Sequence, residues 1–387
     1  MECKKQLLAT SLALTLMGSI FADSGADPDS TTNQAMPTDE GYTPYYYNRN
    51  TSDFFVYADW IYWQPVVEDP MDWCNKFTLL SSVPTVTDDS DTRSLDYDYS
   101  SGFRVGAGYR FGQNYLDQNI RPWQIEAMYT RLHTAESGSA EARGLISASP
   151  GSVYEQLLRR LVPTLNDRFE DTALQGNSRV HLEYDRVDVE FAWPIWMKSN
   201  VILRLMTGAT FAWFENNWTT RFSDMIATSP SAVDPTSSTK TELEWNWWGG
   251  GLFGGGDIYM SIGKGFGFFA NSSFALLFGP MEEKEEYSTF STITGHFTED
   301  ADFTYHFTSF QPVVNFGAGI DYKHWFKDKV MLHMSLGWDF TWWFDMNQFG
   351  RVNERGSHLA TVGQYFDDTE PTDLGFQGLT ARLGFDF

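Results

Sequence analysis

The sequence predicts an all-β fold, a transmembrane antiparallel up-and-down β-barrel of about ten strands. Three observations predict it. Segments along the chain alternate apolar and polar side chains with the period of two that a β-strand requires. The connections between these segments are long and short in turn. The final segment, Gly375 to Phe387, is long enough to cross a bilayer as a tilted strand, and it ends on an aromatic residue, which is typical of outer-membrane barrels.

The N-terminus predicts export through the inner membrane. Residues 1–22 have a basic start, a short apolar run and small residues at the end, which is the pattern of a signal peptide cleaved after Ala22. Residues 23–52 are polar and aperiodic, so we expect a flexible N-terminal segment there. The outer-membrane barrel is then expected at residues 53–387.

The composition excludes several classes of protein. The chain carries 27 Lys and Arg against 51 Asp and Glu, a net charge of -24, so its overall field disfavours nucleic acid. After the signal peptide, no apolar run approaches the roughly 18 residues of a membrane-spanning helix. Yet 17% of the residues are aromatic, as the girdles of a membrane barrel require. Cys74 is the only cysteine expected in the mature chain, so no intramolecular disulfide is expected.

Ten segments are expected to form the strands of the barrel. They are residues 54–64, 102–111, 122–132, 180–193, 201–214, 242–262, 266–278, 303–322, 330–344 and 375–387. The second is the clearest, because Phe103 and Val105 alternate with Arg104 and Gly106. In the fourth, the apolar parity changes near Asp185–Arg186, and one extra residue at a β-bulge would produce that change.

The connections predict which end of the barrel faces the periplasm. The long ones are residues 65–101, 133–178, 215–241, 279–302 and 345–374, and the short ones are 112–121, 194–200, 263–265 and 323–329. Outer-membrane barrels have short periplasmic turns and long extracellular loops, so the long, acidic connections are expected outside the cell. An extra hairpin within 66–101 would raise the count to about twelve strands, and this alternative stays open. Ser152–Leu161 is expected to form a short amphipathic helix in a long loop.

Charged residues within the strands are expected to point into the barrel. Four arginines share the parity of the polar face, and exposure to lipid near the midplane would cost each of them about 2–4 kcal/mol. The candidate pore-lining residues are Arg104, Arg110, Glu126, Arg204, Asn271, His333, Asp339 and Arg382. No cofactor and no metal site are expected.

Two stretches carry a resemblance to a known family. Phe54–Pro65 (FFVYADWIYWQP) and the ending GLTARLGFDF together resemble the major outer membrane protein family of Legionella-like and Chlamydia-like bacteria. The resemblance implies an abundant, porin-like surface protein of the bacterial outer membrane. Chlamydial members are cysteine-rich and cross-linked, whereas the mature chain here keeps Cys74 alone, so a cross-linked envelope role is not implied.

The leading functional hypothesis is porin-like passage of small solutes or ions. About eight strands enclose an interior that side chains just fill, whereas water channels are usual at about 16–18 strands, so a filled, non-conducting barrel stays open as an alternative. A second class of function is adhesion or envelope structure through the acidic extracellular loops.

An outer-membrane hydrolase is the third class. His181, Glu183 and Asp185 share a face near the outer end of the fourth strand, with His133 at the start of the preceding loop. General base chemistry or a metal could use such a set, but a polar network at the rim is the commoner role, so we expect no enzyme. The expected partners are membrane lipid, small solutes or ions, and the barrel-assembly machinery, which would bind the strand Gly375–Phe387. Nucleic acid is not expected, and the oligomeric state is left open.

Overall fold

The computed structural model describes residues 53–68, 71–80, 86–111, 123–142, 157–163, 173–198, 200–224, 238–291, 296–326, 330–349, 352–354, 365–367 and 371–387. The expected signal peptide and N-terminal segment lie outside these stretches. Within them, no helix is long and apolar enough to span a membrane.

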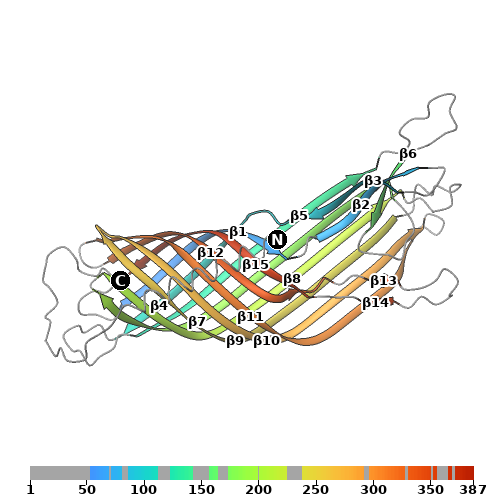
Figure 1. Ribbon diagram of the computed structural model, residues 1–387. Coiled ribbons are helices and arrows are strands. Elements are labelled where there is room, and N and C mark those ends of the chain that lie inside the picture. The colour runs from blue at the N-terminus through green and yellow to red at the C-terminus, as the bar shows by residue number, and fades with distance from the viewer. Residues whose placement is uncertain are drawn as a thin grey trace, which may run out of the picture. The chain divides into compact units, whose positions relative to one another are not determined.

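Ten antiparallel strands close into a barrel, which confirms the predicted fold class (Figure 1). Each of the ten expected segments forms one of these strands. In order around the wall they are β1 (Asp53–Val67), β15 (Thr372–Asp386), β12 (Val330–Asn347), β11 (His296–Phe326), β10 (Phe266–Ser291), β9 (Ser238–Gly263), β8 (Val201–Ser223), β7 (Gln175–Lys198), β5 (Trp123–Glu141) and β4 (Ser100–Phe111). Pairing of the first strand with the last leaves the ring without an open edge at the level of the bilayer, where no water would satisfy unpaired backbone groups.

The long connection after β1 forms a hairpin that stays out of the wall. Its strands β2 (Met71–Leu80) and β3 (Val86–Leu95) pair with each other, and β2 also pairs with β6 (Leu157–Pro163). A further small sheet joins β13 (Val352–Glu354) to β14 (Tyr365–Asp367). The alternative of a larger wall is therefore wrong, although the extra hairpin exists.

The helix predicted at Ser152–Leu161 is wrong where the structure describes it. Residues 157–161 belong to β6 and pair with β2, from Leu80 opposite Leu157 to Lys76 opposite Leu161. A segment this short gains little from helix propensity alone, so pairing with an existing strand outweighs it. Residues 152–156 lie outside the described stretches.

The β-bulge predicted near Asp185–Arg186 is also wrong. Strand β7 pairs with β5 and β8 without a register shift at this point. The same alternate residues point inward along the whole strand. What changes is their chemistry, because the inward face goes from apolar to polar and the outward face from polar to apolar. Tyr184 is buried in the interior while Asp185 faces out, and farther along the strand Asp188 faces the interior while Phe191 faces out.

This exchange marks the level at which the strands leave the membrane. Strands β7, β8, β9, β10 and β11 have 24, 23, 26, 26 and 31 residues. About 9–11 residues suffice to cross a bilayer. On β10 the outward row from Phe266 to Phe278 is apolar except for Ser272, and it then carries Glu282, Lys284 and Glu286. The part of each long strand next to its short periplasmic connection therefore lies in lipid, and the rest extends into water outside the cell.

The extracellular part of the barrel wall packs around an apolar core. The β2–β3 hairpin contributes Trp73, which is 1% exposed and lies 6.0 Å from the ring of Phe222 on β8. Cys74 is fully buried beside it. Burying apolar surface on the inside of this half, with charges outside, is the arrangement of an ordinary water-soluble β-domain.

Candidate functional site

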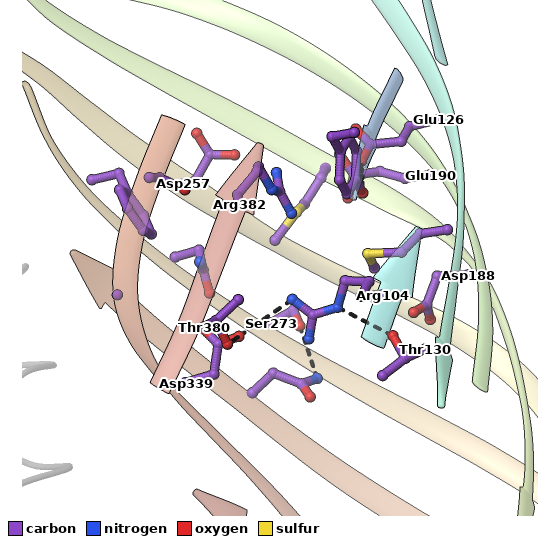
Figure 2. A pocket seen from close by; sticks show the side chains of 18 of the residues that line it. Arg104, Glu126, Thr130, Asp188, Glu190, Asp257, Ser273, Asp339, Thr380 and Arg382 are labelled. Carbon is purple, nitrogen blue, oxygen red and sulfur yellow. Dashed lines mark hydrogen bonds and ion pairs between the residues drawn. The ribbon is translucent and has the colours of Figure 1, made fainter. Parts of the chain in front are cut away.

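All eight residues predicted to line a pore face the barrel interior. Seven of them line one cavity of about 220 Å³ (Figure 2). Arg110 lines a smaller cavity of about 60 Å³, which includes residues at the periplasmic ends of β1 and β15. That the eight residues line a conducting path stays a prediction. Ion pairs crowd the interior around them.

Arg104 of β4 and Arg382 of β15 share the carboxylate of Asp59 on β1. Arg382 donates from Nε to Oδ1 at 2.8 Å and from Nη2 to Oδ2 at 2.9 Å, and Arg104 Nη1 lies 3.4 Å from Oδ2. Arg104 also contacts Asp339 at 3.3 Å, and Asp339 accepts a hydrogen bond from Thr380 at 2.8 Å (Figure 2). Two guanidinium groups and two carboxylates therefore balance in charge inside the membrane-spanning part.

Arg204 of β8 lies among three carboxylates. Its Nε donates to Asp257 at 2.5 Å, and its Nη1 lies 3.2 Å from Glu190 and 3.7 Å from Glu126. The hydroxyl of Tyr57 donates to Glu126 from the opposite side. One basic and three acidic side chains therefore meet in this part of the cavity.

Sequence reasoning missed most of the acidic partners of the predicted residues. These partners are Asp59, Glu190, Asp257, Asp321 and Asp386. It also missed the buried pair of Arg186 and Asp188, which lie 2.8 Å apart. A signal was present, because each of these residues has the inward parity of its strand. Complete pairing matters, since a buried charge without a partner costs several kcal/mol by itself, of the order of 3–5.

Above the charged part, five large side chains cross the lumen. Tyr184, Phe214, Trp247, Trp343 and Phe376, here called the aromatic layer, are each at most 3% exposed. The ring centroids of Tyr184 and Phe376 lie 4.7 Å apart, and those of Phe214 and Trp343 lie 4.8 Å apart. These contacts join strands that are not neighbours in the wall, such as β7 and β15. The aromatic layer therefore reaches across the lumen of the barrel instead of only lining it.

Trp63 of β1 joins the aromatic layer to the charged network. Its indole ring lies 6.4 Å from Phe376 and beneath the guanidinium of Arg104, whose Cζ is 5.2 Å from the ring centroid. Its Nε1 donates to Thr380 at 3.1 Å, and Thr380 in turn donates to Asp339. Packing and hydrogen bonding thus hold the two parts of the interior in one fixed arrangement.

The expected rim cluster of histidines and carboxylates does assemble. His133 Nε2 lies 3.3 Å from Asp185 and 3.6 Å from Glu183, and His181 Nε2 lies 2.9 Å from Glu183. All four side chains face outward, just beyond the apolar belt, and connect β5 to β7. Among the described residues, no group of three or more His, Cys, Asp or Glu is arranged to hold a metal ion.

Comparison with known proteins gives one family and several distant folds. The family model of the Legionella pneumophila major outer membrane protein precursor matches residues 48–387. No curated protein matches the sequence. The outer membrane protease OmpT of Escherichia coli is 8% identical with a TM-score of 0.30, covering 87% of this chain and 96% of its own. The attachment invasion locus protein Ail of Yersinia pestis is 8% identical with a TM-score of 0.22, covering 87% and 100%.

Proposed function

Because this chain belongs to the family of the Legionella pneumophila major outer membrane protein, it is a β-barrel of the bacterial outer membrane, and we propose that it acts there as a structural surface protein with a closed lumen. The single observation that supports the closed lumen is the aromatic layer. Tyr184 on one side of the barrel stacks on Phe376 on the other, so no open path separates them.

Barrel size supports the same proposal. About eight strands enclose an interior that side chains just fill, and ten are close to that limit. The interior side chains are large and are paired with one another, as the contacts of Arg204 and Arg382 illustrate. An ion entering this space would have to lose its water and displace existing partners.

Porin-like passage of small solutes is the second candidate. The observation that favours it is the charged cavity of about 220 Å³ beneath the aromatic layer. Its excess of carboxylates around Arg204 would favour cations. Passage would require the aromatic layer to move aside, so a conducting state would differ from the state described here.

A liposome-swelling assay separates the two candidates. Purified mature protein is reconstituted, and the rate of swelling in small sugars is compared with that of protein-free liposomes. We expect no difference for the wild-type barrel and faster swelling for a barrel in which Tyr184→Ala and Trp343→Ala remove two members of the aromatic layer. Met206→Ala is the matched control, because Met206 lines the cavity below without belonging to the layer. Swelling by the wild type as fast as by the double variant would favour porin-like passage.

We also propose that the protein has no catalytic activity and needs no cofactor. The rim cluster supports a structural role, because His133 and Glu183 are register partners that join β5 to β7. Proteolysis or lipid hydrolysis that disappears in His133→Ala, while the barrel stays folded, would contradict this. Membrane lipid and the barrel-assembly machinery, acting on β15, remain the expected partners.

A further inference from the structure

Strand β12 stops pairing with β11 before β11 ends. The two strands pair from Phe326 opposite Val330 to Val313 opposite Trp343. Two residues later, Asp345 adopts a left-handed backbone with φ of 52°, and its N–H donates to the side chain of Asp373 at 2.9 Å. Because this conformation bends the chain out of the extended form, β12 cannot follow β11 any farther.

Beyond that point, β11 is paired on one side only. It continues along β10 from Pro312 opposite Leu276 to His296 opposite Ser291. Among the described strands, none pairs with the other edge of residues 306–312, here called the free edge. The start of the free edge lies outside the membrane, since His306 is the register partner of Glu282, which is beyond the apolar belt, whereas Phe310 is level with Phe278 at the top of that belt.

Side chains of the free edge are accessible on both faces of the sheet. His306 and Thr308 point outward and are exposed, and Phe307 points to the other face with 39% exposure. Phe310 is 65% exposed at the level of the outer girdle. A strand with an accessible edge and accessible faces is a template for an added strand, whose backbone hydrogen bonds supply affinity and whose side chains supply specificity.

The two faces beside the free edge differ in chemistry. On the outward face, the side chain of Glu282 is 55% exposed and lies 3.9 Å from His306. Next along β10, Lys284 is already paired with Glu286 at 3.4 Å, so it does not neutralise Glu282. On the opposite face, Phe307 offers apolar surface. The whole chain has a net charge of -24, which attracts basic partners.

We propose that the free edge of β11 docks an extended segment of a partner protein in which Lys or Arg alternates with apolar residues. The period of two places the basic side chains on the face that carries Glu282, next to His306 and Thr308, and the apolar ones on the face that carries Phe307. Main-chain hydrogen bonds to β11 then extend the β10–β11 sheet by one strand. This role depends on neither an open nor a closed lumen.

Synthetic peptides test the proposal with the full mature chain in zwitterionic nanodiscs. We expect an alternating Lys-Phe peptide to bind, measured by fluorescence anisotropy, and an alternating Glu-Phe peptide not to bind.

Two N-methylated Lys-Phe peptides then distinguish strand addition from simple charge attraction. One is methylated on every Lys and the other on every Phe, so each has lost the N–H groups along one edge. We expect one of them to bind like the parent and the other to bind at least about tenfold more weakly, because several hydrogen bonds are lost. Equal behaviour of the two would overturn the proposal.

Variants of the chain locate the site. Glu282→Lys should weaken binding of the Lys-Phe peptide, whereas Glu215→Lys, on the same outward face of β8 but away from the free edge, should leave it unchanged. Equal loss in both variants would overturn the proposal in favour of non-specific attraction. A dimer of the chain that forms without peptide, and that the peptide does not dissociate, would assign the edge to a second copy instead.

Discussion

Tyr184 of β7 stacks on Phe376 of β15 across the barrel, with ring centroids 4.7 Å apart and an angle of 17° between the ring planes. The shorter way around the wall between these strands passes through β5, β4 and β1. Their contact therefore spans the lumen. It connects the apolar core of the extracellular part to the charged interior of the membrane-spanning part through Trp63.

Loss of Phe376 should destabilise the barrel strongly. Phe376→Ala removes a side chain that is 1% exposed and leaves a cavity between Tyr184 and Trp63, so we expect the free energy of unfolding to fall by about 3–5 kcal/mol. Urea unfolding in lipid vesicles, followed by tryptophan fluorescence, measures this change. Phe385→Ala on the same strand is the control, because Phe385 is 37% exposed toward lipid and should cost less. Equal costs would contradict a packed layer.

Removal of the charge on Asp59 should also be costly. Asp59 is 2% exposed and is shared by Arg382 and Arg104, so Asp59→Asn leaves two guanidinium groups short of a partner. We expect a loss of about 3–5 kcal/mol in the same unfolding assay. The control is Asp91→Asn, whose ion pair with Arg93 is exposed on both sides and should contribute about 1 kcal/mol or less. A small effect at Asp59 would show that water fills the interior and screens the pair.

The two glycine triplets on β9 provide a test of packing by substitution. A Cβ at Gly251 would lie 1.9 Å from the backbone oxygen of Leu276, which cannot move without breaking the sheet. At Gly254 the nearest atom would be 3.9 Å away, at the oxygen of Met206. We therefore expect Gly251→Ala to reduce the yield of folded, heat-modifiable protein on gels, while Gly254→Ala folds like the wild type. Similar folding of both variants would contradict the register of β9 and β10.

Cys74 should be unreactive in the folded protein. Burial raises the pKa of its thiol to about 12, so the nucleophilic thiolate stays scarce at neutral and mildly alkaline pH. The charged form appears only as the pH approaches this value, and unfolding restores a pKa of about 8.5. We expect a maleimide to label Cys74 after denaturation but not before. In a Cys74→Ala background, Ser137→Cys on the exposed face of β5 should be labelled in both states. Rapid labelling of folded Cys74 would contradict the packing of β2 against the barrel.

The membrane-spanning half of the fold could be predicted from the sequence because lipid imposes one simple rule. Outward residues such as Phe266, Phe268 and Phe274 must be apolar, so the strand positions and their number are visible in the period of two. The inward position of Arg104 and Arg382 follows from the same rule. These side chains could be assigned to the interior without knowing any contact.

The extracellular half could not be predicted in the same way. There the outer face of each strand contacts water and the inner face packs against the apolar core. The polarity of the two faces is therefore the reverse of that in the membrane, as Tyr184 and Asp185 show. Without the level at which the strands leave the membrane, this reversal is indistinguishable from a change of register, which is why a β-bulge was expected. The meeting of Tyr184 with Phe376 depends on closure of the ring across widely separated parts of the sequence.

Electrical recording of single wild-type barrels in planar lipid bilayers tests the closed lumen most directly. The aromatic layer predicts a silent baseline for the wild type and stepwise conductance only after Tyr184→Ala and Trp343→Ala are introduced together. Regular conductance steps from the wild-type protein, unchanged by those two substitutions, would contradict a lumen closed by the aromatic layer.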